Sequence, residues 1–115
     1  MMRLALLAAV LAMPIPALAH AFLERASPPV GSELAQPPHQ LTLTFTEGIE
    51  PLFSTIELRA ANGATVPLGK PHVAADDRQL LVDLPVLQAG EYTVVWHVTS
   101  VDTHKTEGSF RFTVR

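Results

Sequence analysis

The sequence predicts an all-β fold in which two antiparallel sheets, of about seven short strands in total, pack face to face with Greek-key connections. Three observations support this prediction. Apolar and polar residues alternate over several short stretches, and Pro, Gly, Asn and Asp separate these stretches as turn signals. After the first 19 residues, no stretch has the length and periodicity of a substantial helix. Short strands at this spacing are typical of a sandwich.

The N-terminal segment has the features of a secretory signal peptide in the expected order. Met1-Met2-Arg3 supplies the positive charge, and Leu4–Met13 is an uncharged apolar stretch too short to span a bilayer. Pro14-Ile15-Pro16 breaks the helix, and Ala17-Leu18-Ala19 matches the small-x-small cleavage pattern. A buried or uncleaved N-terminal helix is the alternative. We therefore expect residues 1–19 to be a cleaved signal peptide and the protein to be exported.

Residues 20–115 form the expected mature domain and comprise 96 of the 115 residues, which is enough for one core. The absence of cysteine from an exported domain favours a bacterial periplasm. Loss of Arg3 with the leader changes the formal net charge from −3 to −4, which argues against nucleic acid as a partner. The three methionines all lie in the leader. Any metal site in the mature domain must therefore use nitrogen and oxygen donors.

The first strands are expected before the middle of the chain. Phe22-Leu23 is a short apolar stretch, and Leu41–Phe45 alternates strictly with its apolar residues on one face. Ser54–Arg59 alternates in the same way. Asn62-Gly63 is the strongest hairpin signal in the chain, and Thr65–Leu68 should return from that turn.

Three further strands complete the expected sandwich. Gln79–Leu84 ends at a proline, and Gln88-Ala89-Gly90 forms the next turn. The long strand Tyr92–Ser100 contains Trp96, which we expect in the core rather than in a site. Ser109–Val114 closes the domain with alternating apolar residues.

His20 is the histidine whose position matters most. After cleavage it becomes the N-terminal residue and offers both its α-amine and its imidazole. An α-amine has a pKa of about 8, so a metal ion can displace its proton at neutral pH. The amine and the ring Nδ1 then close a six-membered chelate, which suits the tetragonal preference of Cu(II). On the residues alone, an N-terminal histidine that binds nothing is an equal alternative.

Asp102 and His104 form a second candidate cluster, on the loop between the two last strands. In an extended loop, residues two apart point to the same side and can converge on one ion. Taken alone, the motif fits a solvated turn with an Asx-type cap better than a metal site. His39 and His72 are expected on the surface, and His97 on the strand face opposite Trp96.

Motifs at both ends of the mature chain resemble one known family. The run Trp96-x-Val98-x-Ser100-x-Asp102-x-His104, followed by Gly108-Ser109-Phe110-x-Phe112-x-Val114, resembles the C-terminal motif of the copper-resistance protein CopC family. His20 at the cleavage point, Ser27-Pro28-Pro29, Gly31-Ser32 and Phe45-Thr46-Glu47 resemble the opening segments of that family.

The resemblance implies an immunoglobulin-like Greek-key β-sandwich or barrel in the periplasm. It also implies one Cu(II) per chain, bound by His20 through its amine and ring, by Asp102 and by His104. Glu47 matches an acidic residue near that site, as a weak ligand or a neighbour of the ligands; a solvated charge is an equal alternative. Some members carry a Met-rich Cu(I) segment. Residues 59–77 contain His72 but no Met, so a Cu(I) site is not expected.

Three functions compete at this stage. We favour a monomeric copper carrier in copper homeostasis or resistance, not an enzyme, with an inner-membrane copper importer of the CopD type as its partner. A copper redox enzyme with a histidine-brace site is the first alternative, but Asp102 would occupy a position that an oxidant needs. A metal-free interaction module is the second, and it predicts that His20 and His104 can be replaced without consequence.

Overall fold

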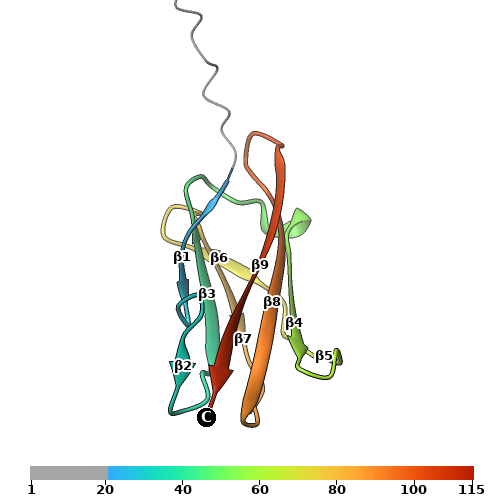
Figure 1. Ribbon diagram of the computed structural model, residues 1–115. Helices are drawn as coiled ribbons and strands as arrows, with labels where there is room; N and C mark the ends of the chain where they lie inside the picture. Colours follow the sequence, from blue (N-terminus) through green and yellow to red (C-terminus); the bar gives the residue numbers. More distant parts are fainter. Residues whose placement is uncertain (1–20) are drawn as a thin grey trace, which may run out of the picture.

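The computed structural model describes residues 21–115, which fold into two β-sheets packed face to face (Figure 1). The strands, in chain order, are β1 (Leu23–Ser27), β2 (Glu33–Leu34), β3 (Gln40–Phe45), β4 (Thr55–Ala60), β5 (Thr65–Val66), β6 (His72–Ala74), β7 (Gln79–Asp83), β8 (Gly90–Thr99) and β9 (Lys105–Val114). A short 3-10 helix, η1 (Pro51–Phe53), precedes β4.

The strand order shows a sandwich with crossing connections. One sheet has the order β1-β3-β7-β6 and the other β2-β9-β8-β4-β5. The pairings are antiparallel except that β2 lies parallel to β9. The chain passes from one sheet to the other between β1 and β2, β2 and β3, β3 and β4, β5 and β6, and β7 and β8. The all-β sandwich predicted from the sequence is therefore confirmed.

Several element boundaries differ from the predicted ones. Residues 21–115 form nine strands rather than about seven, because β2 and β6 are short edge strands of two and three residues with no full period of alternation. β9 begins at Lys105 instead of Ser109, and β1 extends to Ser27. The extra residues of β1 and β9 carry mostly exposed polar side chains and show no clear apolar alternation. They belong to strands because their backbones pair with β3 and β8.

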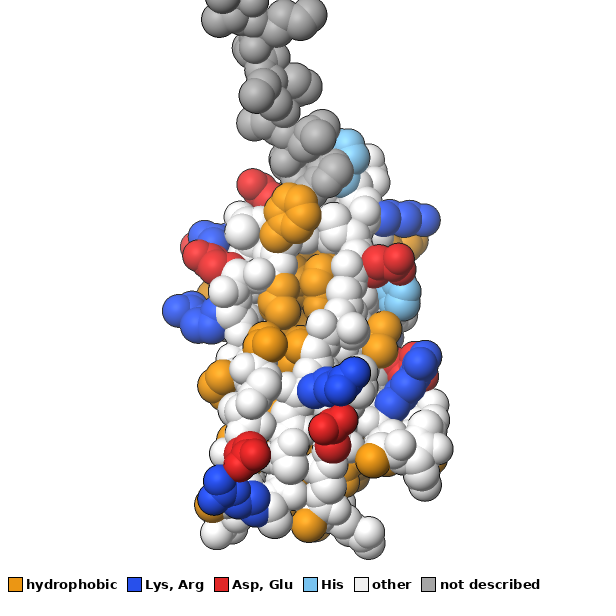
Figure 2. Space-filling model, in the orientation of Figure 1, with side chains coloured by type: hydrophobic (Ala, Val, Ile, Leu, Met, Phe, Trp, Pro, Cys, Tyr) orange, Lys and Arg blue, Asp and Glu red, His pale blue; other side chains and the backbone are white. Residues whose placement is uncertain are grey.

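The core fills the space between the two sheets and comes from alternate residues of the long strands. Its fully buried members include Leu41, Leu43, Phe45, Leu58 and Val94. Figure 2 shows apolar side chains in the line between the sheets, with charged side chains on both flanks. The predicted Asn62-Gly63 hairpin is also confirmed, since β4 pairs with β5 and Gly63 has a φ of 84°.

Trp96 packs in this core as predicted, and Gly108 makes room for it. The ring of Trp96 meets Phe45 edge to face, with centroids 5.2 Å apart. Trp96 and Gly108 are paired residues of β8 and β9. A Cβ atom at position 108 would lie 2.5 Å from Cζ2 of Trp96, closer than such atoms approach. The indole can therefore keep this position only when residue 108 is glycine.

Replacing Gly108 with alanine should destabilise the domain by about 1–3 kcal/mol, because the indole must leave its place against Phe45. Urea unfolding followed by tryptophan fluorescence measures this change. Gly69→Ala is the matched control, since a Cβ there meets nothing within 4 Å. Equal unfolding midpoints for the two variants would contradict the steric argument.

Candidate metal centre

The loop that joins β8 to β9, residues 100–104 and called here the hairpin loop, is held by a small set of hydrogen bonds. The backbone N–H of Ser100 donates to the carbonyl of His104 at 2.8 Å, and that of Thr103 to the carbonyl of Ser100 at 2.8 Å. Thr103 has a φ of 74°, in the left-handed region that a β-branched residue rarely adopts. Ser100 itself is fully buried. The loop is therefore a hydrogen-bonded turn whose first residue, Ser100, is buried in the fold.

Asp102 and His104 lie side by side on this loop. Nδ1 of His104 is 3.2 Å from Oδ2 of Asp102. Both side chains are partly open to solvent, with 36% of the aspartate and 48% of the histidine exposed. The sequence predicted that these two side chains would point to the same side, and the structure brings them together. Their role as metal ligands stays a prediction.

Ser100 orients this pair from below. Its hydroxyl donates a hydrogen bond to Oδ1 of Asp102 and accepts one from the backbone N–H of His104 at 3.2 Å. The Ser100 hydroxyl, followed by the His104 ring, lowers the pKa of Asp102 below its ordinary value. Asp102 is therefore a carboxylate at neutral pH. Sequence reasoning gave Ser100 no role of its own, although its place at the buried end of β8, two residues before Asp102, is a usable signal.

The hairpin loop belongs to one end of the sandwich, called here the hairpin end, which also includes loops 46–54 and 75–78. The backbone N–H of Val101 donates to the carbonyl of Gly48 at 2.9 Å, and that of Ile49 to the carbonyl of Asp77 at 2.7 Å. An isolated bridge pairs Ile49 with Ser100. Loop 46–54 thus joins the other two loops into one connected surface.

The first described residues are tied to the same end. The carbonyl of Ala21, which is fully buried, accepts a hydrogen bond from the Thr106 hydroxyl at 2.6 Å. The N–H of Phe22 donates to Oγ1 of Thr46 at 3.0 Å, and the N–H of Thr46 donates to the carbonyl of Phe22 at 2.9 Å. The chain therefore enters the fold between the end of β3 and the start of β9. Glu47, the residue after Thr46, is half-buried at this end.

The predicted site is thus only partly within the described residues. His20 lies outside them, and Glu47, Asp102 and His104 lie at the hairpin end. Within residues 21–115, no group of three or more His, Asp or Glu side chains is arranged to hold a metal ion. As arranged in the described residues, Asp102 and His104 are a pair and not a three-residue site.

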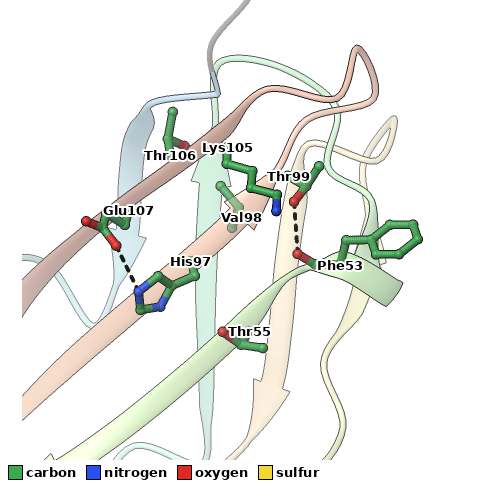
Figure 3. Close-up of a pocket in the computed structure, with 8 residues that line it drawn as sticks. All are labelled: Phe53, Thr55, His97, Val98, Thr99, Lys105, Thr106 and Glu107. Carbon is green, nitrogen blue, oxygen red and sulfur yellow. Dashed lines mark hydrogen bonds and ion pairs between the residues drawn. The ribbon is translucent and has the colours of Figure 1, made fainter.

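A hollow of about 470 Å³ lies next to the hairpin end, on the outer face of the five-stranded sheet (Figure 3). Nε2 of His97 is 2.9 Å from Oε2 of Glu107 at its floor, and Phe53 and Lys105 are among its other lining residues. His97 faces outward, opposite Trp96, as the sequence predicted. The hollow itself was missed, because it depends on where η1 lies relative to the strands.

Ser100→Ala should raise the pKa of Asp102 toward the ordinary value, because the strongest hydrogen bond to the carboxylate is lost. A carboxyl group whose folded pKa is lowered stabilises the fold above its unfolded pKa, and this stabilisation is lost as pH falls through the folded pKa. As pH falls, the variant should therefore lose less of its free energy of unfolding than the unmodified chain does. Carboxyl-carbon NMR titration measures the pKa, with the exposed Ser109→Ala as control. An unchanged Asp102 pKa would refute the role given to Ser100.

Comparison with known proteins identifies relatives over nearly all of the described chain. Residues 23–115 match the family model described as the CopC domain. Protein YobA of Escherichia coli K12 is 39% identical over 101 residues, which cover 84% of this chain and 80% of YobA. Copper resistance protein C of Xanthomonas campestris pv. juglandis is 35% identical over 97 residues, covering 77% and 76% of the two chains.

Copper transport protein CutJ of Bacillus subtilis is 30% identical over 104 residues, covering 89% of this chain but only 19% of CutJ. Among solved structures, CopC from Methylosinus trichosporium OB3b matches with a TM-score of 0.78 and 38% identity, covering 83% of this chain and 93% of that one. PcoC, a methionine-rich copper resistance protein from Escherichia coli, matches with a TM-score of 0.75 and 29% identity, covering 84% and 100%. This chain belongs to the CopC domain family, together with proteins of copper resistance and copper transport.

Proposed function

We propose that this chain is a periplasmic copper carrier that binds one Cu(II) at the hairpin end after residues 1–19 are removed. The ligands are His20, through its α-amine and its ring, together with Asp102 and His104. Glu47 is a weak ligand or a neighbour of the ligands. The observation that carries the proposal is the anchoring of Ala21 to Thr106, two residues beyond His104 in the chain.

The hydrogen bond between Ala21 and Thr106 matters because it limits how far the preceding residue can lie from the start of β9. Consecutive Cα atoms are about 3.8 Å apart, so a residue joined to Ala21 starts one such step from a buried, hydrogen-bonded position. Ala21 is held against the start of β9, and His104 immediately precedes that strand. The proposed N-terminal donors therefore need little free chain to meet the Asp102–His104 pair.

The chemistry of the donors supports Cu(II). Two ligands about 2 Å from one ion and at right angles to each other are about 2.8 Å apart, close to the 3.2 Å between the Asp102 oxygen and the His104 nitrogen. Three nitrogens and one carboxylate oxygen suit a tetragonal Cu(II) site. Residues 20–115 contain no Met or Cys, so a thioether or thiolate site for Cu(I) is not proposed.

The position of the proposed site supports the role of a carrier. The pair is partly exposed at one end of the molecule, where a second protein can reach the ion. We propose an inner-membrane copper importer of the CopD type as that second protein, and a monomer as the carrier. Among residues 21–115, no helix is long and apolar enough to cross a membrane.

The mature chain beginning at His20 should bind one equivalent of Cu(II), with an electron paramagnetic resonance spectrum typical of a tetragonal, nitrogen-rich site. A variant with one extra alanine before His20 should bind at least about tenfold more weakly, because the α-amine is moved away from the ring. Copper titration by competition with a chelator measures both affinities.

An extended variant that binds as tightly as the mature chain would remove the α-amine from the ligand set. Weak, non-stoichiometric binding by both forms would refute the site as a whole. The metal-free interaction module would then be the function to test.

Asp102→Asn and His104→Ala should each weaken Cu(II) binding by at least about tenfold. Each variant should also change the electron paramagnetic resonance spectrum as expected for a site with one ligand fewer. His72→Ala is the matched control, since His72 is an exposed residue of β6. Unfolding midpoints confirm that each variant is folded. Affinities within twofold of the unmodified chain would exclude the two residues as ligands.

A further inference from the structure

Large apolar side chains are exposed mainly at the hairpin end. Among residues 21–115, six such side chains are exposed, and four of them lie at this end. Leu52 and Phe53 of η1 are the most open of these four, at 79% and 70%, and Phe22 and Val101 follow at 57% and 53%. Neither Leu52 nor Phe53 belongs to the core or packs against it. Adjacent apolar side chains that are exposed to solvent beside the proposed metal site are typical of an interaction surface.

The fold holds Leu52 and Phe53 in a fixed position. The Thr99 hydroxyl donates to the carbonyl of Phe53 at 3.0 Å. The Ser54 hydroxyl donates to the carbonyl of Glu50 at 2.7 Å and accepts from the N–H of Thr99 at 3.1 Å. Figure 3 shows the Phe53 carbonyl facing Thr99 while its ring projects beyond η1, away from His97 and Glu107. An apolar pair held this way loses little backbone freedom when it binds a partner.

The charge of the hairpin end narrows the kind of partner. Loops 46–54, 75–78 and 100–104 carry five carboxylates and one arginine. That arginine, Arg78, is already engaged, with one nitrogen 3.0 Å from Oε2 of Glu24 and another donating to the carbonyl of Phe45 at 3.1 Å. The three loops of the hairpin end therefore carry a net negative charge, which complements a basic surface, while Lys105 lies beside Phe53 in the hollow next to η1.

We propose that Leu52 and Phe53 are the apolar anchor by which this chain docks on a copper transport protein, in a pocket with an apolar floor and a basic rim. The CutJ relative supports this choice of partner. This chain matches only 19% of CutJ, so there a region similar to this chain is one part of a much longer copper transport protein. The inference rests on the proposed carrier function and adds the surface through which copper is handed on.

The hollow below η1 extends the docking surface. Its volume of about 470 Å³ is large enough for side chains of a partner, and Phe53 forms part of its wall. Lys105 and the His97–Glu107 pair supply polar groups along the same hollow. A partner that covers η1 would therefore meet an apolar protrusion next to a hollow with a few polar groups, and the two together fix one orientation.

The test uses purified CutJ in two forms, full-length and lacking the region that matches this chain, both checked for a single folded species. Copper-loaded chain should bind the shortened form, and bind full-length CutJ more weakly because the resident domain competes. Leu52→Ser/Phe53→Ser should weaken binding at least about tenfold, as expected for central apolar anchors. Val30→Ser/Val86→Ser is the matched control, since both valines are exposed but lie in other loops.

Charge supplies a second readout. Asp76→Asn/Asp77→Asn keeps residue types that tolerate the positive φ angles of 58° and 60° at these positions, and removes two charges. It should slow association and reduce its dependence on salt, while the apolar variant should mainly speed dissociation.

Three results would overturn the inference: no binding of the unmodified chain to either form of CutJ, equal binding of the two double serine variants, or binding that is insensitive to salt. Cu(II) titration of each variant separates this failure from that of the carrier function. If Leu52→Ser/Phe53→Ser binds copper normally and binds CutJ as tightly as the unmodified chain, only the docking surface is refuted. If the unmodified chain binds no copper, the carrier function itself is refuted.

Discussion

The antiparallel ladder between β8 and β9 is the interaction on which the rest of the structure depends. Its ten residue pairs run from Gly90 and Val114 to Thr99 and Lys105 without a break in register. Because side chains alternate between the two faces, this register puts Trp96 over Gly108 and leaves His97 opposite Glu107 on the outer face. A slip of one residue would reverse both faces. The same ladder fixes where the hairpin loop begins, and so places Asp102 and His104.

Ser100 links the core to the candidate site. It continues the inward-facing row of β8 and is fully buried, yet it carries a hydroxyl. A buried hydroxyl needs partners, and the Asp102 carboxylate and the backbone N–H of His104 supply them. Satisfying one buried polar group therefore orients both residues of the pair. A carboxylate that is already oriented loses less freedom when it meets a cation.

Sequence reasoning predicted most of the fold and the contact between two residues of the candidate site, for identifiable physical reasons. Strict alternation in Leu41–Phe45 and the Asn62-Gly63 turn are local signals, and the structure confirms both. The two-residue strand β2 has no local signal, because pairing with β9 defines it. Asp102 and His104 lie close in sequence, so their contact could be predicted. The anchoring of Ala21 by Thr106 joins residues 85 positions apart and follows only from the packing of the two sheets.

Negative charge at the hairpin end connects stability with binding. Five carboxylates lie in the three loops of this end, and a concentration of like charge of this kind opposes the compact state. A cation bound there reduces the repulsion, and a ligand that binds only the folded form stabilises it. The basic rim of a docked partner would act on the same charges. The proposed ion and the proposed partner would both neutralise this end, so each would reduce the electrostatic free energy that the other gains on binding.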